Sequence, residues 1–425
     1  MNAIKKKSAG SKKPQLLAGM SDILPETSPL WEHLAQKLQR IARGFGFNRV
    51  ETPLLESPSL FELYAGENPS QIIFLDQHGE RTALRSAILP SLMRAYSETT
   101  FPEGHKFSKW HYFAPVANYD ANQKRYHSQW QFGFELFGEF SSLNEVQLIN
   151  LIWKFLQSSG LKDLVLEINS TGKNECRKDY DQTLGGFLQS RKYELCNDCA
   201  AAIDDYPMQV FRCTNLECRT VAQEAPQVVD YLDADCHKHF TGVLEALDEV
   251  GIGYSLNPLL VGGPGTSQTV FAFKFHDAKG DHLLGEGSHH DSIYREITGK
   301  DAACFGYYFS IDEMQKYITE VQLETISEHK AEVFLAPLGD LASKKALKLF
   351  SELWDSNVAV HDHFGSSGVK EQLKAAEGSK AMLALIIGQK EAMDDTVILR
   401  DVKSGMQEVF RYDQIIDEVK KRLGK

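Results

Sequence analysis

Four cysteines form the pattern in this sequence that is most typical of a metal site. Cys196 and Cys199 are separated by two residues, and Cys213 and Cys218 follow with four residues between them. Four thiolates in two closely spaced pairs suit tetrahedral Zn²⁺. Such a site would be structural, because four thiolates leave no open position for water. The alternative is four reduced cysteines that pack a helical segment, and of the two we favour zinc.

A histidine pair and a glycine-rich segment could also be ligand-binding sites, but their sequence patterns do not support this. His289 and His290 are adjacent, with His276 and His282 nearby, but the spacing matches no recognised ligand pattern. We interpret the histidine pair as part of a solvated loop. The glycine-rich segment 262–266 could bend around a phosphate, but no helix start or lysine follows it, so a plain loop is the better interpretation.

The composition indicates a soluble globular protein of two or three domains. The chain has 425 residues, of which 42% are hydrophobic and 24% charged. It contains no apolar run near the roughly 18–20 residues that span a membrane. The basic stretch at 1–15 lacks the apolar core of a secretory signal, so we predict a disordered tail. Without an export signal, the cysteines indicate a reducing, cytoplasmic location.

The charge balance limits the role of nucleic acid as a partner. The net charge is −12, which argues against a protein that coats nucleic acid non-specifically. A local basic face is still compatible with this charge, because lysines and arginines are frequent after residue 340.

Hydrophobic periodicity places these residues in two successive domains. Residues 16–324 are predicted to mix helices and strands, with a strand at 49–55 and a mostly helical insertion at about 174–250 that carries the cysteine cluster. A linker is predicted at 325–331. Strands and helices then alternate over 330–425, which predicts a small α/β domain with a mixed sheet. The whole chain is therefore expected to be α+β.

Several stretches in chain order resemble bacterial histidyl-tRNA synthetases. They are Gly19–Pro25, Phe47–Pro53, the pair Gln123–Tyr126 and Gln131–Gly138, and the run from Ala359 to Gln407. The resemblance extends from about Leu17 to the C-terminus. It implies a class II synthetase fold, in which an antiparallel sheet is flanked by helices and followed by an anticodon-binding domain. It also implies a homodimer, because the stretch 47–53 resembles the dimer-forming motif of that family.

The resemblance identifies the positions at which amino-acid activation would need charged groups. Activation places charge on the α-phosphate of ATP, which arginines and Mg²⁺ stabilise. Asn118, Gly262 and Glu313 stand where the family has its three arginines for this step, and Ala87 replaces a glutamate of the ammonium site. Removing one such donor typically costs about 10²–10³ in rate. We therefore predict that no catalytic set is intact, and we do not expect ATP or Mg²⁺ to bind.

Some polar residues of the same motifs are retained. They are Arg85, Asp120, Arg125, Tyr126, Gln131 and Glu135. The resemblance implies that they are remnants of the family's pocket for ATP and histidine. Gln131 and its neighbours lie on or beside a predicted central strand, so packing and hydrogen bonding of the scaffold explain them better than a ligand does.

These observations favour a non-catalytic paralogue, a pseudoenzyme that acts by binding. Its partners would be tRNA, through the C-terminal domain, or another protein. One alternative is an active histidine–tRNA ligase in which the expected residues are misaligned. A second is a protein similar to the regulatory subunit of ATP phosphoribosyltransferase, although such subunits lack the anticodon domain and keep the histidine-binding residues. A third is a different ligase with a remodelled pocket.

Overall fold

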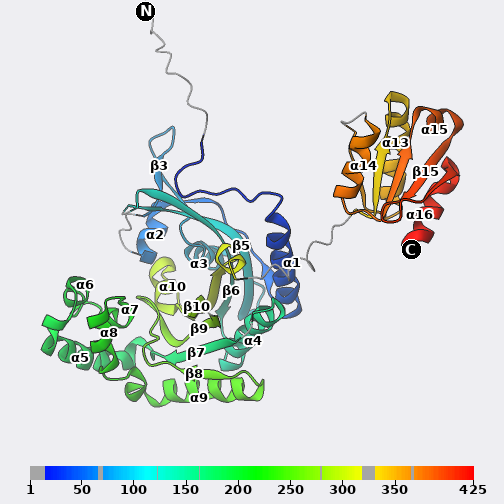
Figure 1. Cartoon of the computed structure of the whole chain (residues 1–425). Helices are drawn as coiled ribbons and strands as arrows, with labels where there is room; N and C mark the ends of the chain where they lie inside the picture. Colours follow the sequence, from blue (N-terminus) through cyan, green and yellow to red (C-terminus); the bar gives the residue numbers. More distant parts are fainter. Residues whose placement is uncertain are drawn as a thin grey trace, which may run out of the picture. The chain divides into compact units, whose positions relative to one another are not determined.

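The computed structural model describes residues 15–65, 70–121, 123–161, 163–277, 280–317, 331–364 and 368–425. The chain forms two compact units, Met1–Gln322 and Leu323–Lys425 (Figure 1). Residues 1–14 of the predicted tail and 325–330 of the predicted linker lie outside the described residues. Among the helices of the described residues, none is long and apolar enough to cross a membrane.

An eight-stranded sheet organises the first unit. Its order is β1 (Asn48–Arg49), β5 (Phe107–Asp120), β6 (Arg125–Gly138), β11 (Ala303–Ser310), β10 (Gly280–His289), β9 (Ser267–Asp277), β7 (Leu164–Ser170) and β8 (Tyr254–Leu256). The inner pairs are antiparallel, while β1 pairs with β5 and β8 with β7 in parallel. Phe271 and Phe273 on β9 are both buried, as are Ala272 and Val270 between and before them. The sheet is therefore covered on both faces there, which explains a continuous apolar run in place of alternation.

Helices and a small sheet surround these strands. The helices are α1 (Ser28–Gly44), α2 (Pro58–Ala65), α3 (Leu89–Glu98), α4 (Ser142–Ser158), α10 (Asp291–Thr298) and α11 (Ile311–Gln315). The small sheet has the order β2 (Leu55–Glu56), β4 (Arg81–Leu84) and β3 (Ile73–Leu75). In α1, Leu30, Leu34 and Leu38 are buried at four-residue spacing, which fixes the face that packs inward.

The segment predicted as a helical insertion is helical. It contains α5 (Asn174–Ser190), α6 (Asn197–Ala201), α7 (Gln209–Arg212), α8 (Leu216–Gln223) and α9 (Ala234–Glu249). Tyr180, Leu184 and Leu188 on α5 pack with Cys199 and Cys218 in one buried cluster. The cysteine pairs therefore lie within the core of the insertion.

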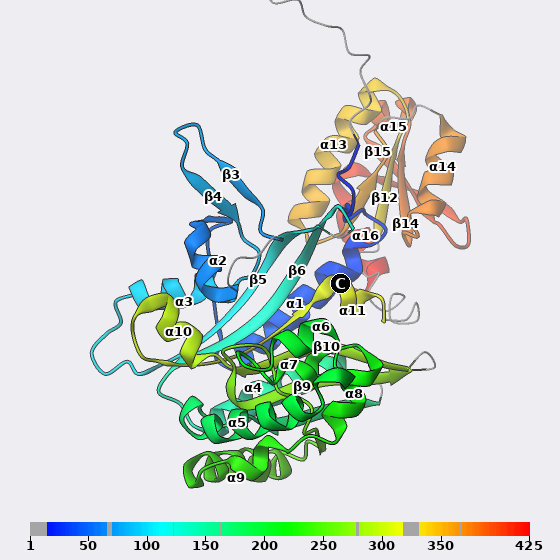
Figure 2. The same ribbon diagram turned by 90° about the vertical axis from the view of Figure 1, so that its left-hand side faces the viewer.

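The second unit is an α/β domain with a mixed sheet, as the alternating pattern predicted. The strand order is β13 (Val360–Asp362), β12 (Val333–Pro337), β14 (Leu383–Ile387), β15 (Thr396–Asp401) and β16 (Gln407–Arg411). The helices are α13 (Asp340–Asp355), α14 (Val369–Gly378), α15 (Gln389–Asp394) and α16 (Ile415–Leu423) (Figure 2). The pairs β13–β12 and β12–β14 are parallel, and the pairs β14–β15 and β15–β16 are antiparallel.

The predicted α+β class is confirmed, and one predicted strand is wrong. The segment 49–55 is split, because β1 ends at Arg49 and β2 begins only at Leu55. Pro53 has no N–H to donate to a ladder. The carbonyl oxygens of Thr52 and Pro53 instead accept hydrogen bonds from the Arg85 side chain.

Candidate functional site

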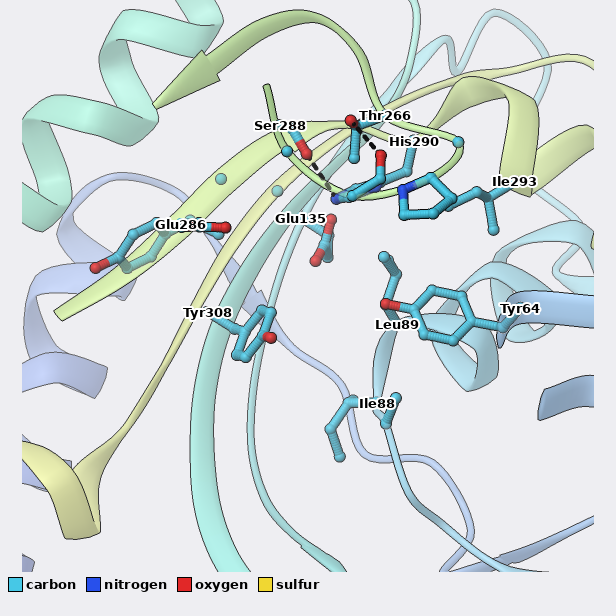
Figure 3. Close-up of a pocket in the computed structure, with 18 of the residues that line it drawn as sticks. Tyr64, Ile88, Leu89, Glu135, Thr266, Glu286, Ser288, His290, Ile293 and Tyr308 are labelled. Atoms are coloured by element: carbon cyan, nitrogen blue, oxygen red, sulfur yellow. Dashed lines mark hydrogen bonds between the residues drawn. The ribbon is translucent and has the colours of Figure 1, made fainter. Parts of the chain in front are cut away.

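A cavity of about 820 Å³ lies in the first unit. The segment 86–89 and the glycine-rich loop 262–266 form parts of its wall. Strands β5, β6, β9, β10 and β11 and helices α2, α7 and α10 contribute most of the other lining residues. Figure 3 shows the carboxyl group of Glu135 in the middle of this space, between Tyr308 and His290. The cavity is large enough for a small-molecule ligand.

The cavity brings together half of the ten pocket residues that the resemblance indicated. Ala87, Asn118, Gln131, Glu135 and Gly262 all line it. These residues come from distant parts of the chain, so the family motifs do converge on one place. The remaining predicted residues, which are Glu313, Arg85, Asp120, Arg125 and Tyr126, are absent from its described lining.

Gly262 occupies a backbone conformation that disfavours an arginine. Its φ is +67°, in the left-handed region that favours glycine. A Cβ at this position would meet the Thr266 Oγ1 at 2.5 Å. The same hydroxyl donates to the Gly263 carbonyl oxygen at 2.7 Å and closes the turn. The predicted plain loop is therefore a turn that closes on itself, and it has no room for a side chain at Gly262.

Asn118 and Ala87 form an uncharged part of the wall. The Asn118 Nδ2 donates to the Ser86 carbonyl oxygen at 3.4 Å, so the amide ties β5 to the loop that carries Ala87. The hydroxyl of Ser86 in turn donates to the Gln71 Oε1 at 3.0 Å. These contacts fix the loop without presenting a cation to the cavity.

Glu313 lies outside the cavity, in the first turn of α11. Its Oε1 accepts from the Lys316 Nζ at 2.6 Å, and both side chains are at least half exposed. Its backbone N–H donates to the Ser310 Oγ, which caps the helix. Glu313 is therefore a surface residue that follows β11.

Arg85 is buried and its guanidinium donates mainly to backbone carbonyl oxygens. Nη1 donates to the Thr52 carbonyl oxygen at 2.8 Å and to the Pro53 carbonyl oxygen at 3.3 Å. Nη2 donates to the Pro115 carbonyl oxygen at 3.0 Å. Burial lowers the pKa of Arg85, while the nearby Glu51 and Glu56 oppose that shift. The side chain joins three segments of the scaffold.

Asp120, Arg125 and Tyr126 lie at the end of the β5–β6 hairpin. Asp120 pairs with Arg125 across the two strands, and the Asp120 Oδ1 accepts from the Gln123 N–H in the turn. The Tyr126 N–H donates to the Ala18 carbonyl oxygen at 2.9 Å, which attaches the N-terminal motif to the hairpin. Gly19 follows with a φ of +89°, and a Cβ there would overlap the Tyr126 carbonyl oxygen. The three retained residues thus stabilise the hairpin end.

Glu135 is the most buried carboxylic acid of the described lining, with 2% of the residue exposed. Burial raises the pKa of Glu135 well above the usual range of a carboxylic acid, and a contact with the Cys304 thiol opposes that shift. Gly306 lies opposite on β11, and a Cβ there would overlap the Glu135 carboxyl group. The glycine therefore makes the space in which the carboxyl group sits.

Other charged residues of the lining were not predicted. Glu62, Glu286 and Glu296 join Glu135 in the wall, while Arg212 is the one lysine or arginine in the described lining. The Arg212 Nη1 lies 3.8 Å from the Glu286 Oε2, so its charge is already partnered. These residues come from α2, α7, β10 and α10, and no common motif in the sequence could have grouped them.

The interpretation of His289 and His290 as solvated loop residues is wrong. His289 is the last residue of β10, and 2% of it is exposed. His290 lines the cavity, and burial together with the charge of His289 lowers the pKa of His290 to about 4. The prediction failed because β10, which the sequence pattern ended at Gly287, continues to His289, and His290 is the N-cap of α10.

The four cysteines of the insertion converge on one point. Their sulfur atoms all lie within 4.8 Å of one another, and Cys196 Sγ and Cys213 Sγ are 3.7 Å apart. A tetrahedral zinc with Zn–S bonds of about 2.3 Å sets sulfurs about 3.8 Å apart. The Cys196 N–H donates to the Cys218 Sγ at 3.1 Å. The donor set and its spacing therefore fit zinc.

The architecture is that of solved histidyl-tRNA synthetases. The apo enzyme from S. aureus matches with a TM-score of 0.78 at 23% identity, covering 96% of this chain and 100% of that one. An ATP phosphoribosyltransferase regulatory subunit/histidyl-tRNA synthetase from Bacillus halodurans has a TM-score of 0.62 at 18% identity, covering 90% and 99%. At these identities the likeness shows a common fold.

The chain belongs to the histidyl-tRNA synthetase family. Residues 19–314 match the histidyl-tRNA synthetase family model, and residues 332–422 match a separate anticodon binding domain model. The histidine–tRNA ligase of Dehalococcoides mccartyi is 30% identical over 412 residues, which cover 95% of this chain and 99% of the relative. That of Thermodesulfovibrio yellowstonii is 28% identical over 417 residues, covering 96% and 99%.

Proposed function

We propose that this chain is a non-catalytic member of its family that acts by binding tRNA. The acidic cavity is the observation that carries the proposal. Four glutamates line it, and its one described arginine, Arg212, lies against Glu286. Even with a proton on Glu135, the wall holds three carboxylates. A triphosphate of high negative charge would be repelled there.

The replaced residues support the same proposal because their surroundings have adapted to them. The turn at Gly262 leaves no room for a larger side chain, and the Asn118 amide is hydrogen-bonded to the wall. A misaligned sequence would instead leave an arginine from a neighbouring position pointing into the cavity, and the described lining offers none besides Arg212.

We expect no ATP–pyrophosphate exchange from the purified full chain with histidine and Mg²⁺. The transition state would lack its cationic donors, each of which typically contributes about 10²–10³ in rate. The Dehalococcoides mccartyi histidine–tRNA ligase, assayed in parallel, is the positive control. Exchange at a rate within about tenfold of that enzyme would overturn the proposal.

Two alternative functions have specific support. The curated relatives named histidine–tRNA ligase favour an active ligase, and the exchange assay decides between it and our proposal. The likeness to the Bacillus halodurans structure favours a regulatory role beside a phosphoribosyltransferase. That role predicts co-purification with a short catalytic chain, whereas tRNA binding does not.

The anticodon-binding domain supports tRNA as the partner. Lys370 and Lys374 lie one turn apart on the exposed face of α14, and Lys380 follows the helix. Among the residues that the structure describes, none forms an ion pair with any of these three lysines. Free cations in a row suit contact with successive phosphates.

Replacing Lys370 and Lys374 together by glutamate should weaken tRNA binding by the full chain. Two lost phosphate contacts make the plot of log affinity against log salt shallower by roughly 1.5. Filter binding between low and moderate salt measures this slope. The control is Lys344→Glu with Lys348→Glu, which changes the charge equally at the same spacing on α13. Equal weakening by both pairs would contradict binding through α14.

We also propose that Cys196, Cys199, Cys213 and Cys218 bind one structural zinc. The compact arrangement of the four sulfurs supports it. An organomercurial reagent, which displaces metals from thiolates, should release one zinc per chain, measured with a colour-forming chelator. Cys213→Ser should lose this zinc and lower the thermal midpoint. The matched control is Cys176→Ser, a half-buried cysteine of the same insertion that should keep it. Release of no zinc from the wild type would refute the site.

A homodimer completes the proposal. Apolar side chains on β2 and β3 and in α2 are exposed in the isolated chain, among them Leu55, Leu63, Phe74 and Leu75. Contiguous exposed apolar surface often marks a protein interface. Light scattering of the purified chain gives its mass and tests the dimer.

A further inference from the structure

A second cluster of metal-binding side chains lies away from the four cysteines. Glu145 in the first turn of α4, His239 on α9 and His289 at the end of β10 place their donor atoms within 4.8 Å of one another. The Glu145 side chain is fully buried and 3% of the His289 side chain is exposed. Three elements that are distant in sequence therefore direct two imidazoles and a carboxylate to one point.

The contacts within this cluster leave polar atoms without adequate partners. The Glu145 Oε1 lies 2.9 Å from the His289 Nε2 and 2.7 Å from the His239 Nε2. The His239 Nε2 has no aligned hydrogen bond, and the buried Glu145 Oε2 has no partner among the described residues. An unpaired buried carboxylate oxygen is costly. A cation between these atoms would satisfy both of them.

The surroundings of His289 resemble the outer shell of a metal site. Its second nitrogen, Nδ1, lies 3.5 Å from the Asp291 Oδ1 and 3.4 Å from the Gln268 Nε2. The Asp291 Oδ1 is itself held by the Cys304 N–H at 2.8 Å. A histidine that binds a metal commonly donates its other N–H to a carboxylate in this way. The ring is also fixed between Phe140 and Phe305.

Charge balance favours a divalent ion. A histidine binds a metal through its neutral imidazole. With His239 and His289 in that form, the carboxylates of Glu145 and Asp291 leave two negative charges in a largely buried place, and one divalent ion neutralises them. The Glu145 Oε2 provides a fourth donor beside Oε1 and the two nitrogens. Donor atoms around a tetrahedral zinc with bonds of about 2.1 Å stand about 3.4 Å apart. The contacts here are shorter, 2.7 and 2.9 Å, so the donors would have to separate slightly to admit the ion.

We propose that Glu145, His239 and His289 bind a zinc ion that ties helix α9 of the insertion to α4 and the central sheet. Nitrogen and carboxylate donors suit a borderline divalent ion, of which zinc is the common example. In Figures 1 and 2, α9 runs beside the body of the first unit near α4, and the two helices are in contact. The ion has a route of access, because 26% of the His239 side chain is exposed. Its role is to hold these elements together, because the three ligands come from α4, α9 and β10.

Zinc loading of the full chain, followed by metal analysis and zinc X-ray absorption, tests this site. The wild type should bind a zinc with a nitrogen and oxygen shell, separate from any zinc with a sulfur shell. His239→Gln should lower the affinity for that ion by at least about 100-fold, more than loss of an outer-shell partner. The matched control is His237→Gln, an exposed histidine on the same helix, which should keep it.

The outcomes separate this site from the cysteine site. If the cysteine site is wrong, the wild type retains a single zinc with a purely nitrogen and oxygen shell. A wild type whose zinc has only sulfur neighbours overturns the histidine site, as does a His239→Gln variant that keeps the nitrogen and oxygen shell. The wild-type spectrum decides the matter even if the variant fails to fold.

Discussion

Replacing Arg85 by methionine should destabilise the first unit by about 3 kcal/mol. The guanidinium donates to the carbonyl oxygens of Thr52, Pro53 and Pro115. Each buried acceptor left without a donor costs about 1–3 kcal/mol, and relief from burying the cation offsets part of the sum. Methionine retains much of the volume of the arginine side chain, so the loss of stability measures mainly the lost hydrogen bonds. Thermal unfolding should shift down by roughly 6 °C.

The control for Arg85 is the same substitution at Arg125. Arg125 is exposed at the hairpin end, so Arg125→Met should shift the midpoint by less than about 1 °C. The shift for Arg85→Lys should lie between the other two. A lysine keeps the charge, but it lacks the planar guanidinium that donates to three carbonyl groups at once. Equal midpoints for Arg85→Met and Arg125→Met would show that Arg85 is not a scaffold residue.

The sequence predicted the parts of the site that are continuous motifs. Asn118, Gly262, Gln131 and Glu135 were each located by a local stretch, and the fold brings them to one cavity. The cysteine pairs were located in the same way, because their spacing is itself the signal. The fold class followed from the same stretches and from the alternating strands and helices of the second unit.

Side-chain direction and long-range pairing could not be predicted. Arg85 and Glu313 lie within motif stretches, yet Arg85 points into the scaffold and Glu313 to the surface. The cluster of Glu145, His239 and His289 joins positions up to 144 residues apart. Its members share no motif, so only the packing of α4, α9 and β10 reveals it. Cys176 and Cys236 are likewise scattered in sequence, but their sulfurs lie 3.6 Å apart.

Replacing Glu135 by glutamine should stabilise the protein increasingly as the pH rises from 5 to 8. Burial raises the pKa of Glu135 well above its usual value, so the folded chain holds a proton that the unfolded chain releases above about pH 4.3. The unfolded state then binds fewer protons than the folded state, and stability falls with pH by up to about 1.4 kcal/mol per unit. This loss stops once the pH exceeds the folded pKa.

The amide of Glu135→Gln does not titrate and therefore avoids that loss. Wild type and variant should have similar thermal midpoints near pH 4.5. Above this pH, the midpoint of the variant should rise steadily relative to that of the wild type. Glu296→Gln removes an exposed carboxylate from the same cavity and is the matched control for the change in cavity charge. If the thermal midpoint of the wild type instead rises relative to that of Glu135→Gln as the pH increases, Glu135 is held as a carboxylate. The cavity would then carry a fourth negative charge, which would make it still less suited to ATP.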